Sequence, residues 1–497
     1  MIGTWCRAHT GWGILMALLA ASLIASSAAQ SVDATTFSST VEAETMHGSS
    51  TSSKIFSDST ASGGQALMLF RNGTVSTEFY GSPDGVIVRA RGDQCRGAPR
   101  MVVKVDGVQQ LSISIRSTMW TDYALSIPPS SGKHVLAISF TNDYHRSRSC
   151  DRNLRLDKVS FMISGEGNAP TGFVTRSGTS FVLDSKPLHF VGANMYNAAG
   201  DPGIYECGPW MQNPDTELED WFARFKRDSG GQVVRFWAYQ SYTKGGTDWS
   251  AFDRVMRLAN KYGLKVIPVL ENQWVECSEG GYKYSSWYSD GYLKPYGSYP
   301  LSYKEYVRRV VERYKDEPAV AAWMLMNEAE SKKPSGEEDP EALYAFASDM
   351  SVLIKGLDQN HLVTLGSIGT GQPGVSGSNY QRLYALPTLD FVEFHDYGAN
   401  DEAMPGALAN ARHTARELNK PILMGEAGMT TCGAYNGSQQ ETSQSRAQKL
   451  EAKIGAFFDE GGAGYLIWAW HPNSDCSYDF TTGDPLNTVL TKYIADL

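Results

Sequence analysis

The sequence contains little that would suit a zinc finger, a nucleic-acid partner or a membrane. None of its seven cysteines stands in a Cys-x-x-Cys spacing, so a structural zinc site is a weak alternative. Charged residues make up 20% of the 497 residues, and the acidic ones outnumber the basic ones, 54 to 44, for a formal net charge of −10. This balance argues against nucleic acid and anionic membranes as partners and suits a neutral polymer.

Long apolar runs are equally scarce. The run at residues 13–24 is shorter than the roughly 20 residues that a membrane span needs. Arg7 precedes it, and the small residues Ser27, Ala28 and Ala29 follow it, as in a secretory signal peptide. We therefore expect residues 1–29 to be a signal peptide and the mature protein to be secreted and monomeric. A membrane anchor is the alternative.

Two parts of the remaining chain follow different patterns. Residues 35–163 form short runs of alternating apolar and polar residues, punctuated by Gly, Ser, Pro and Asp, which is typical of an all-β jelly roll or sandwich. Residues 164–172 are rich in Gly, Pro and Thr and are expected to be a linker. From residue 173 to 497, apolar runs alternate with amphipathic stretches such as residues 249–263, which end on a glycine suited to a helix C-cap.

The second part contains eight apolar runs that we expect to be buried parallel strands. They are residues 189–196, 233–239, 265–272, 319–328, 362–368, 389–397, 421–428 and 463–471. Eight strand–helix alternations predict a (β/α)8 TIM barrel, closed by a helix at residues 484–497. A doubly wound open sheet is the second choice, but no Gly-x-Gly-x-x-Gly follows the first strand.

Two domains divide the six cysteines that remain when Cys6 leaves with the signal peptide. An even number in an oxidising compartment indicates disulfide bonds. Cys95 and Cys150 are the two cysteines of residues 35–163, so pairing within each domain leaves Cys95–Cys150 as the single choice there. The other four cysteines allow three arrangements, of which Cys207–Cys277 with Cys432–Cys476 is favoured.

Polar and aromatic residues gather at the expected C-terminal ends of the barrel strands, where barrels carry their active sites. Two of them are glutamates, Glu328 and Glu426. Two carboxylates about 5 to 5.5 Å apart are what retaining glycoside hydrolysis requires, one as acid/base and one as nucleophile. The other strand-end residues are Asn194, Tyr196, Arg235, Trp237, Asn272, Trp274, Asn327, His395, Tyr397, Trp468, Trp470 and His471. A single such residue is more often structural, but their recurrence on most strand ends indicates a site.

The ordered set resembles glycoside hydrolase family 5, in which an Asn-Glu pair ends strand four and a second glutamate ends strand seven. Here these are Asn327-Glu328 and Glu426, and the resemblance covers most of residues 173–480. It implies that Glu426 is the nucleophile and Glu328 the acid/base. Arg235 and Tyr397 would keep Glu426 ionised, so that the pKa of Glu328 lies above that of Glu426.

The same resemblance gives the neighbouring residues expected roles in substrate binding. Asn327 would hydrogen-bond the sugar 2-hydroxyl, and His395 would orient Glu328 or the sugar, unless it is a satisfied core histidine. Trp468 would be the floor of a sugar subsite. Asn272 and Trp274 would also contact substrate, and the loop at residues 276–300 would shape further subsites.

The N-terminal part resembles calcium-dependent carbohydrate-binding modules. Glu42, Glu44 and Asp157 match the residues that share a structural calcium ion there, and hard oxygen ligands suit that ion. Residues 91–107, 120–123 and 142–153 resemble the xylan-binding branch, which implies a second calcium ion that binds sugar hydroxyls. Its candidate ligands are Asp122, Asp143, Asp151 and the Trp120 carbonyl, although loop aspartates cap turns far more often than they bind metal.

These patterns together predict a secreted retaining endo-β-glycanase that acts on β-1,4-linked plant cell-wall polysaccharide and needs no cofactor for catalysis. Residues 181–194 and 355–364 resemble the mannanase-like branch, which makes β-mannan the first choice of substrate. Mannanases often continue Asn-Glu-Pro-Arg, whereas Ala329 and Glu330 follow here. Xylan, β-glucan or exo-action therefore stay open, and a non-catalytic carbohydrate-binding protein is the alternative of a different class.

Overall fold

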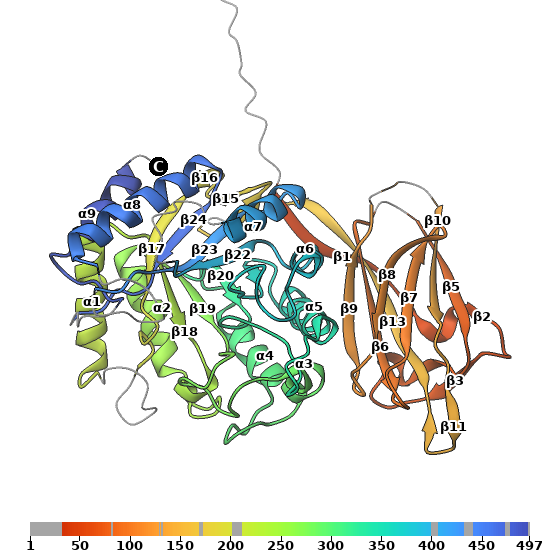
Figure 1. The fold of residues 1–497 in the computed structure, drawn as a ribbon. Helices are drawn as coiled ribbons and strands as arrows, with labels where there is room; N and C mark the ends of the chain where they lie inside the picture. The colour runs from red at the N-terminus through yellow and green to blue at the C-terminus, as the bar shows by residue number, and fades with distance from the viewer. Residues whose placement is uncertain are drawn as a thin grey trace, which may run out of the picture. The chain divides into compact units, whose positions relative to one another are not determined.

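The computed structural model describes residues 32–80, 83–128, 130, 133–167, 172–200, 211–398, 406–431, 441–472 and 478–495. The expected signal peptide lies outside these ranges, as do Cys207, Cys432 and Cys476. Figure 1 shows an all-β region coloured red to orange and a region of strands and helices coloured yellow to blue. Within the described ranges, no helix combines the length and the apolar character needed to cross a bilayer.

The N-terminal region is built from two antiparallel sheets. The first has the order β3-β4-β13-β6-β9, with β1 also pairing with β13, and the second has the order β2-β5-β10-β7-β8. Their bounds are β1 Val32–Glu42, β2 His47–Gly48, β3 Ser53–Ser57, β4 Gln65–Leu69, β5 Gly73–Tyr80, β6 Gly85–Asp93, β7 Arg100–Val105, β8 Val108–Ser114, β9 Thr121–Ser126, β10 Lys133–Phe140 and β13 Asn153–Gly167. A small ribbon of β11 (His145–Ser147) and β12 (Cys150–Asp151) lies outside both sheets.

Alternation along these strands places one face of each sheet in a shared core. On β10, Leu136, Ile138 and Phe140 are buried while the residues between them are more exposed, as a half-buried strand requires. The predicted disulfide Cys95–Cys150 is present, with 4.9 Å between the Cα atoms. Strand β13 continues to Gly167, so part of the segment expected to be a linker is strand.

All eight predicted barrel strands are present, and each is shorter than the apolar run that predicts it. They are β17 Phe190–Asn194, β18 Val233–Trp237, β19 Lys265–Val269, β20 Ala322–Met324, β21 Leu362–Thr364, β22 Val392–Asp396, β23 Ile422–Ala427 and β24 Gly464–Ile467. They form one sheet of order β21-β20-β19-β18-β17-β24-β23-β22 with parallel pairing. The ends of this order meet where Asp390 N donates to Val363 O at 2.8 Å, which closes the barrel.

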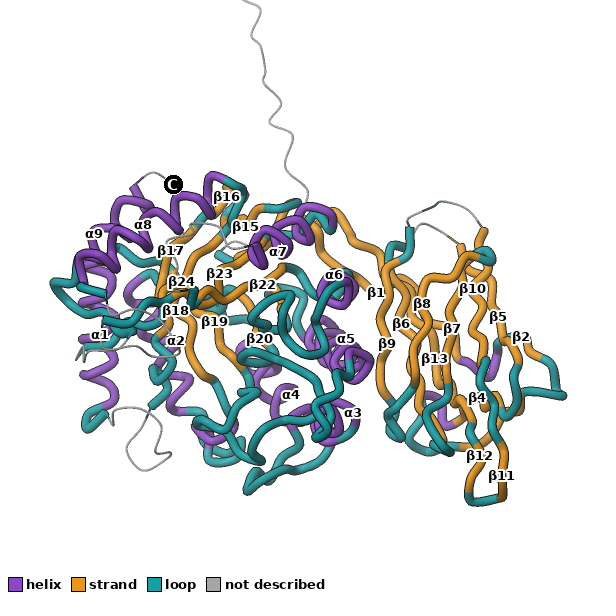
Figure 2. The backbone as a smooth tube through the Cα atoms, in the orientation of Figure 1, coloured by secondary structure: helices purple, strands orange, loops and turns teal. Residues whose placement is uncertain are grey.

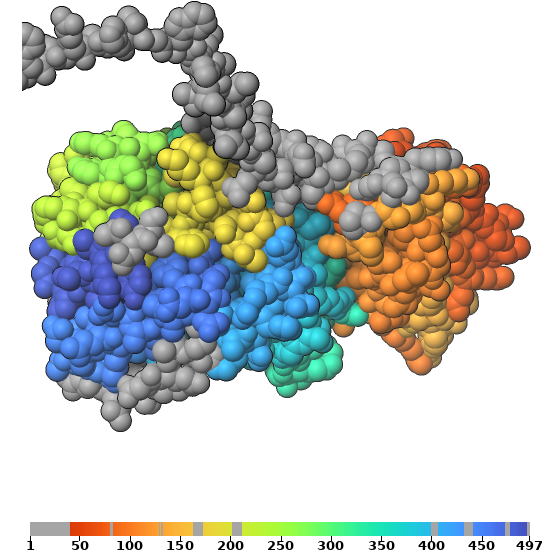
Figure 3. Space-filling model, turned by 90° about the horizontal axis from the view of Figure 1, so that it is seen from above, coloured from red at the N-terminus to blue at the C-terminus, as the bar shows by residue number. Residues whose placement is uncertain are grey.

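Helices lie around these strands in the tube view (Figure 2). They are α1 Pro214–Ser229, α2 Ser250–Tyr262, α3 Ser285–Ser289, α4 Tyr303–Tyr314, α5 Pro340–Leu357, α6 Ser378–Tyr384, α7 Gly406–Glu417, α8 Ser443–Asp459 and α9 Pro485–Ala495. Helix α2 ends as predicted at Gly263, whose φ of 61° suits glycine. In Figure 3 the blue C-terminal segment lies beside the yellow and green start of the barrel, and β17 pairs with β24.

A short antiparallel sheet was not predicted and covers the beginning of the barrel strands. It consists of β14 (Val174–Ser177), β15 (Ser180–Leu183) and β16 (Lys186–Leu188). Phe181 on β15 packs its ring 5.4 Å from Phe190 and 5.3 Å from Phe391, at the starts of β17 and β22. This apolar cap leaves the C-terminal strand ends as the place for a polar site.

Candidate active site

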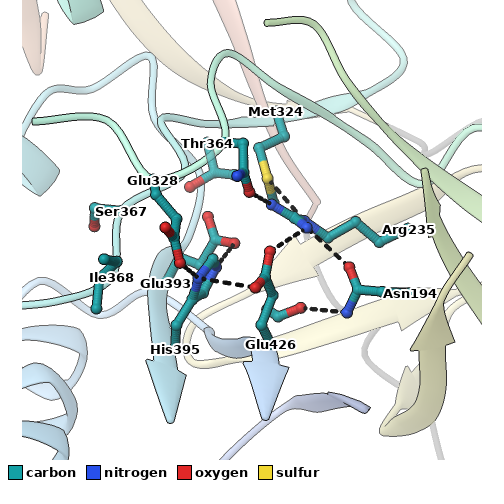
Figure 4. A network of polar contacts seen from close by, with 12 residues as sticks. Asn194, Arg235, Met324, Glu328, Thr364, Ser367, Ile368, Glu393, His395 and Glu426 are labelled. Carbon is teal, nitrogen blue, oxygen red and sulfur yellow. Dashed lines mark hydrogen bonds and ion pairs between the residues drawn. The ribbon is translucent and has the colours of Figure 1, made fainter. Parts of the chain in front are cut away.

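The strand ends bring Arg235 and Glu426 together in a buried ion pair. Nη1 of Arg235 donates to Glu426 Oε1 at 2.6 Å and to Asn194 Oδ1 at 2.8 Å, and Nη2 donates to Asn327 Oδ1 at 2.6 Å. The hydroxyl of Tyr397 donates to the other oxygen of Glu426, Oε2, at 2.5 Å. Figure 4 shows the guanidinium between the Asn194 amide and the Glu426 carboxylate. Both oxygens of Glu426 are thereby held in fixed directions.

Glu328 is held by two donors on its side chain and by an unusual backbone conformation. Trp274 Nε1 donates to Oε2 at 2.6 Å, and His395 Nδ1 lies 2.9 Å from Oε1. Glu328 has a φ of 55°, a left-handed conformation that non-glycine residues adopt rarely, at a cost of about 1–3 kcal/mol. Gln372 Nε2 donates to the Glu328 carbonyl at 2.7 Å. The surrounding structure therefore fixes the direction in which this carboxylate points.

One carboxylate oxygen of Glu328, one of Glu426 and a ring nitrogen of His395 lie within 4.8 Å of one another. Carboxylates this close suit a retaining pair, whose carboxyl groups lie about 5 to 5.5 Å apart. The same three groups could in principle ligate a metal ion. Arg235, 2.6 Å from Glu426, would repel such a cation, and hydrogen-bond donors already reach both carboxylates.

The ionisable groups at this centre shift one another's pKa. Burial alone would lower the pKa of His395, but Glu426, Glu328 and Glu393 raise it to about 10. Burial raises the pKa of Glu328, yet His395 and Trp274 outweigh burial and leave that pKa below its usual value. Burial also raises the pKa of Glu426, and its neighbours His395 and Arg235 do not fully offset this.

The expected order of these pKa values is therefore wrong for the free site. The predicted order depends on Arg235 and Tyr397, which do contact Glu426. Burial decides the order instead, because it raises the pKa of Glu426 by more than His395 and Arg235 lower it, whereas at Glu328 the contacts with His395 and Trp274 outweigh burial.

Aromatic rings extend the site from the two glutamates. Trp468 is half-buried and stacks on Tyr196, with ring centroids 5.3 Å apart and planes 11° apart. Trp237 is buried, and its ring contacts the rings of Trp468, Tyr196 and Tyr239. Trp274 lies 5.7 Å from the Tyr282 ring, in the expected subsite loop.

Other strand-end residues belong to the core or reach the site indirectly. Trp470 is 1% exposed and packs on Trp221 and Phe225. Asn272 is 1% exposed, accepts a hydrogen bond from Asn327 Nδ2 at 3.1 Å and donates one to the Glu276 carbonyl. Asn272 is therefore placed to position Asn327.

Sequence reasoning missed Glu393, Gln372 and the contact between Asn194 and Arg235. Glu393 is fully buried on β22, with Oε1 3.2 Å from His395 Nε2. A signal for it was present, because a glutamate stands inside a run expected to be buried on both faces. Gln372 comes from a loop and carries no such signal.

In the N-terminal region, the turn at Ser62 and Gly63 gathers the three residues expected to share a structural calcium ion. Ser62 Oγ donates to Glu42 Oε2 at 2.6 Å, and Ser62 N donates to Asp157 Oδ1 at 2.8 Å. A Cβ at Gly63 would lie 3.6 Å from Glu44 Oε1, and the buried Glu44 Oε2 has no hydrogen-bond partner among the described residues. Arg89 Nε lies 2.9 Å from Asp157 Oδ2 and occupies one side. Carboxylate oxygens with an unused acceptor suit a hard cation by their chemistry, but among the described residues Glu42, Glu44 and Asp157 form no group with ligand atoms within 4.8 Å of one another.

The residues expected to bind a second calcium ion are not brought together. Asp122 stands opposite Arg89 in the β6–β9 ladder, and its carboxylate pairs with that guanidinium at 3.2 Å. Asp151 Oδ1 lies 3.1 Å from His145 Nδ1, in the β11–β12 ribbon. Among the described residues, Asp122, Asp143 and Asp151 form no group with ligand atoms within 4.8 Å of one another. Trp120 donates its indole N–H to Thr60 and packs under Arg91.

A closed eight-stranded barrel with a carboxylate pair at retaining distance defines a glycoside hydrolase. Residues 192–474 match the family model "Cellulase (glycosyl hydrolase family 5)", and residues 85–175 match "Ca-dependent carbohydrate-binding module xylan-binding". The protein belongs to glycosyl hydrolase family 5, as the sequence patterns predicted.

Three curated relatives of the chain are named as mannan endo-1,4-beta-mannosidases. A probable mannan endo-1,4-beta-mannosidase C of Aspergillus terreus is 30% identical over 50% of this chain and 70% of its own. The mannan endo-1,4-beta-mannosidase A of Podospora anserina is 26% identical over 68% of this chain and 91% of its own. A probable mannan endo-1,4-beta-mannosidase A of Aspergillus flavus is 29% identical over 53% of this chain and 73% of its own.

Proposed function

We propose that the protein is a secreted, monomeric endo-β-1,4-mannanase that acts by a retaining double displacement. The observation that supports the chemistry best is the Glu328–Glu426 pair, whose nearest carboxylate oxygens lie within 4.8 Å. The substrate is proposed from the relatives, which are named as mannan endo-1,4-beta-mannosidases. Secretion is proposed from the disulfide Cys95–Cys150, because such bonds persist in oxidising compartments.

In the first displacement, Glu426 attacks the anomeric carbon while Glu328 gives its proton to the leaving glycosidic oxygen. The C–O bond to the leaving sugar breaks and an ester bond to Glu426 forms. Arg235 and Tyr397 hold the two oxygens of Glu426 in line for the attack. In the second displacement, Glu328 takes a proton from water, the water oxygen bonds to the anomeric carbon, and Glu426 is released as a carboxylate.

Glu328 needs a proton before the first displacement, although its pKa is lowered in the free site. We assign that proton to uptake from bulk solvent, while His395 Nδ1, 2.9 Å from Glu328 Oε1, keeps its own proton and donates a hydrogen bond to the Glu328 carboxyl group. Asn327 has one amide hydrogen left after its bond to Asn272, and we assign it to the sugar 2-hydroxyl. Trp468, half-buried above Tyr196, is the proposed floor for a pyranose ring.

For the N-terminal module we propose binding to β-linked plant cell-wall polysaccharide, with one structural calcium ion. Glu42, Glu44 and Asp157 would hold that ion, which would tie the turn at Ser62 to strand β13. The second, sugar-binding calcium ion is not part of the proposal, because Asp122 pairs with Arg89 and Asp151 lies against His145 in a separate ribbon. Chelation by EDTA should lower the melting temperature of the module. An unchanged melting temperature would refute the proposed structural calcium ion.

The function is tested by a product profile on β-mannan, xylan and mixed-linkage β-glucan. We expect a series of manno-oligosaccharides from β-mannan, with the β-configuration retained in the first NMR spectra. The Glu426→Ala variant should fold normally and keep less than about a thousandth of the activity. Preferred cleavage of xylan or β-glucan would overturn the substrate, and hydrolysis of none of the three would favour a non-catalytic carbohydrate-binding protein.

A further inference from the structure

Glu393 lies next to the catalytic pair and has no part in the two displacements. Its carboxylate is fully buried, with Oε1 3.2 Å from His395 Nε2. The other oxygen, Oε2, has no hydrogen-bond partner among the described residues. Figure 4 shows the contact between the Glu393 carboxylate and the imidazole of His395. A buried carboxylate with so few bonds needs a nearby positive charge.

The imidazole of His395 faces carboxylates on both sides. Nδ1 is 2.9 Å from Glu328 Oε1 and 3.6 Å from Glu426 Oε2, while Nε2 faces Glu393. A neutral imidazole has only one N–H, so one of its nitrogens would point a lone pair at a carboxylate. A ring protonated on both nitrogens donates to both sides.

The neighbouring strand leaves room for this contact. Gly425 precedes the nucleophile on β23, and a Cβ there would lie 2.1 Å from Glu393 Oε1 and 3.0 Å from His395 Nε2. Any side chain at position 425 would therefore displace Glu393 or His395. The absence of a Cβ beside the nucleophile gives the Glu393–His395 pair its space.

We propose that Glu393 is a positioning residue that keeps His395 protonated on both nitrogens and so balances the charge of the reactive site. The inference rests on the proposed hydrolase function. In the reactive state, Arg235 and His395 carry two positive charges, Glu426 and Glu393 carry two negative charges, and the protonated Glu328 is neutral. Without the Glu393 charge the same state would carry a net positive charge, which favours loss of a proton from Glu328 or His395.

The other titratable groups that face this pair come from several elements. They are Arg235 on β18, Tyr380 and Tyr384 on α6, Tyr397 after β22 and Glu426 on β23. Tyr380 donates its hydroxyl to the Glu393 carbonyl and fixes the backbone. Within the described part of the chain, Glu393 is the anion that bonds to Nε2 of His395.

The first test needs no variant and no substrate. In the full chain labelled with 15N-histidine, the imidazole of His395 should show two protonated nitrogens at pH 7, assigned by its loss in His395→Asn. A singly protonated ring at pH 7 would overturn the proposal. Because no turnover is measured, this result is independent of whether the protein hydrolyses β-mannan.

The second test is the pH dependence of hydrolysis by Glu393→Gln. We expect kcat to fall about tenfold with KM nearly unchanged, and the alkaline limb of the kcat/KM profile to move down by about one pH unit. Glu393→Asp keeps the negative charge, so the alkaline limb of its kcat/KM profile should stay at the wild-type pH while kcat is reduced. An equal shift in the Asp and Gln variants, or no shift in the Gln variant, would overturn the proposal.

A matched control separates this effect from a loss of stability. Asp390 is a buried carboxylate just before β22 and pairs with Lys355 at 2.7 Å, away from His395. Asp390→Asn should lower the melting temperature and leave the pH limb in place. If it moves the limb as Glu393→Gln does, the role of Glu393 is structural and the proposal fails.

Discussion

Arg235 Nη1 lies 2.6 Å from Glu426 Oε1, and the other terminal nitrogen of the same guanidinium lies 2.6 Å from Asn327 Oδ1. The nucleophile on β23 and the residue before the acid/base are thus held by one side chain of β18. A planar guanidinium can do this because its donors point in fixed directions, whereas an ammonium group is a single point of charge. The relative placement of the two glutamates therefore depends on Arg235.

Replacement of Arg235 by lysine keeps the charge but removes this geometry. We expect kcat to fall at least about 100-fold, because the nucleophile loses a preorganised donor. The melting temperature should also fall, since Asn194 and Asn327 lose a buried partner. Steady-state kinetics and thermal unfolding check both effects. Arg308→Lys, on the exposed face of α4, is the matched control and should change neither kcat nor the melting temperature. A kcat near the wild-type value in Arg235→Lys would contradict this account.

Trp274 should influence the acid/base through its N–H group. The indole donates to Glu328 Oε2 at 2.6 Å and helps to lower the pKa of Glu328. Trp274→Phe keeps most of the ring and removes the donor, so the pKa of Glu328 should rise. The alkaline limb of the pH–rate profile should then move to higher pH, opposite to the shift expected for Glu393→Gln, with kcat reduced about tenfold. Trp287→Phe on α3 serves as the control. A downward shift for Trp274→Phe would refute the assignment.

His395 should make the stability of the barrel depend on pH. Its pKa rises from 6.5 to about 10 on folding, so its protonated form stabilises the folded state. That contribution is complete below pH 6.5 and is lost as the pH rises toward 10. Urea unfolding at pH 7 and pH 10 should show a loss of stability in the wild type that is clearly smaller in His395→Asn. Equal losses in the two proteins would place the pH dependence elsewhere.

The barrel and its two glutamates could be predicted because both follow from local patterns. Runs such as residues 319–328 are apolar throughout, and the polar residue that ends each run stands at the carboxyl end of a strand. The strand itself is shorter, Ala322–Met324 in this case, because the apolar run continues into the loop that carries Asn327 and Glu328. Closure of the barrel then brings Glu328 and Glu426 together.

Features that depend on distances between side chains could not be predicted. The order of the pKa values of Glu328 and Glu426 turns on how deeply each carboxylate is buried and on how closely His395, Trp274 and Arg235 approach it. In the module, the resemblance grouped Asp122 with Asp143 and Asp151. The register of β6 and β9 places Asp122 opposite Arg89 instead, and a one-residue change in that register would have turned it to the other face.

The Cys95–Cys150 disulfide should stabilise the module without serving the catalytic site. It links residues 55 apart in the sequence, and closing a loop of that length in the unfolded chain corresponds to about 4 kcal/mol. The Cys95→Ser/Cys150→Ser variant should therefore unfold its module at a lower temperature. Hydrolysis of short, soluble oligosaccharides should continue at the wild-type rate, because the catalytic glutamates and their partners all lie on the barrel. Calorimetry measures the unfolding temperature of the module, and oligosaccharide kinetics on the same preparation measure the rate of hydrolysis. A parallel loss of oligosaccharide turnover would mean that the module supports the barrel directly.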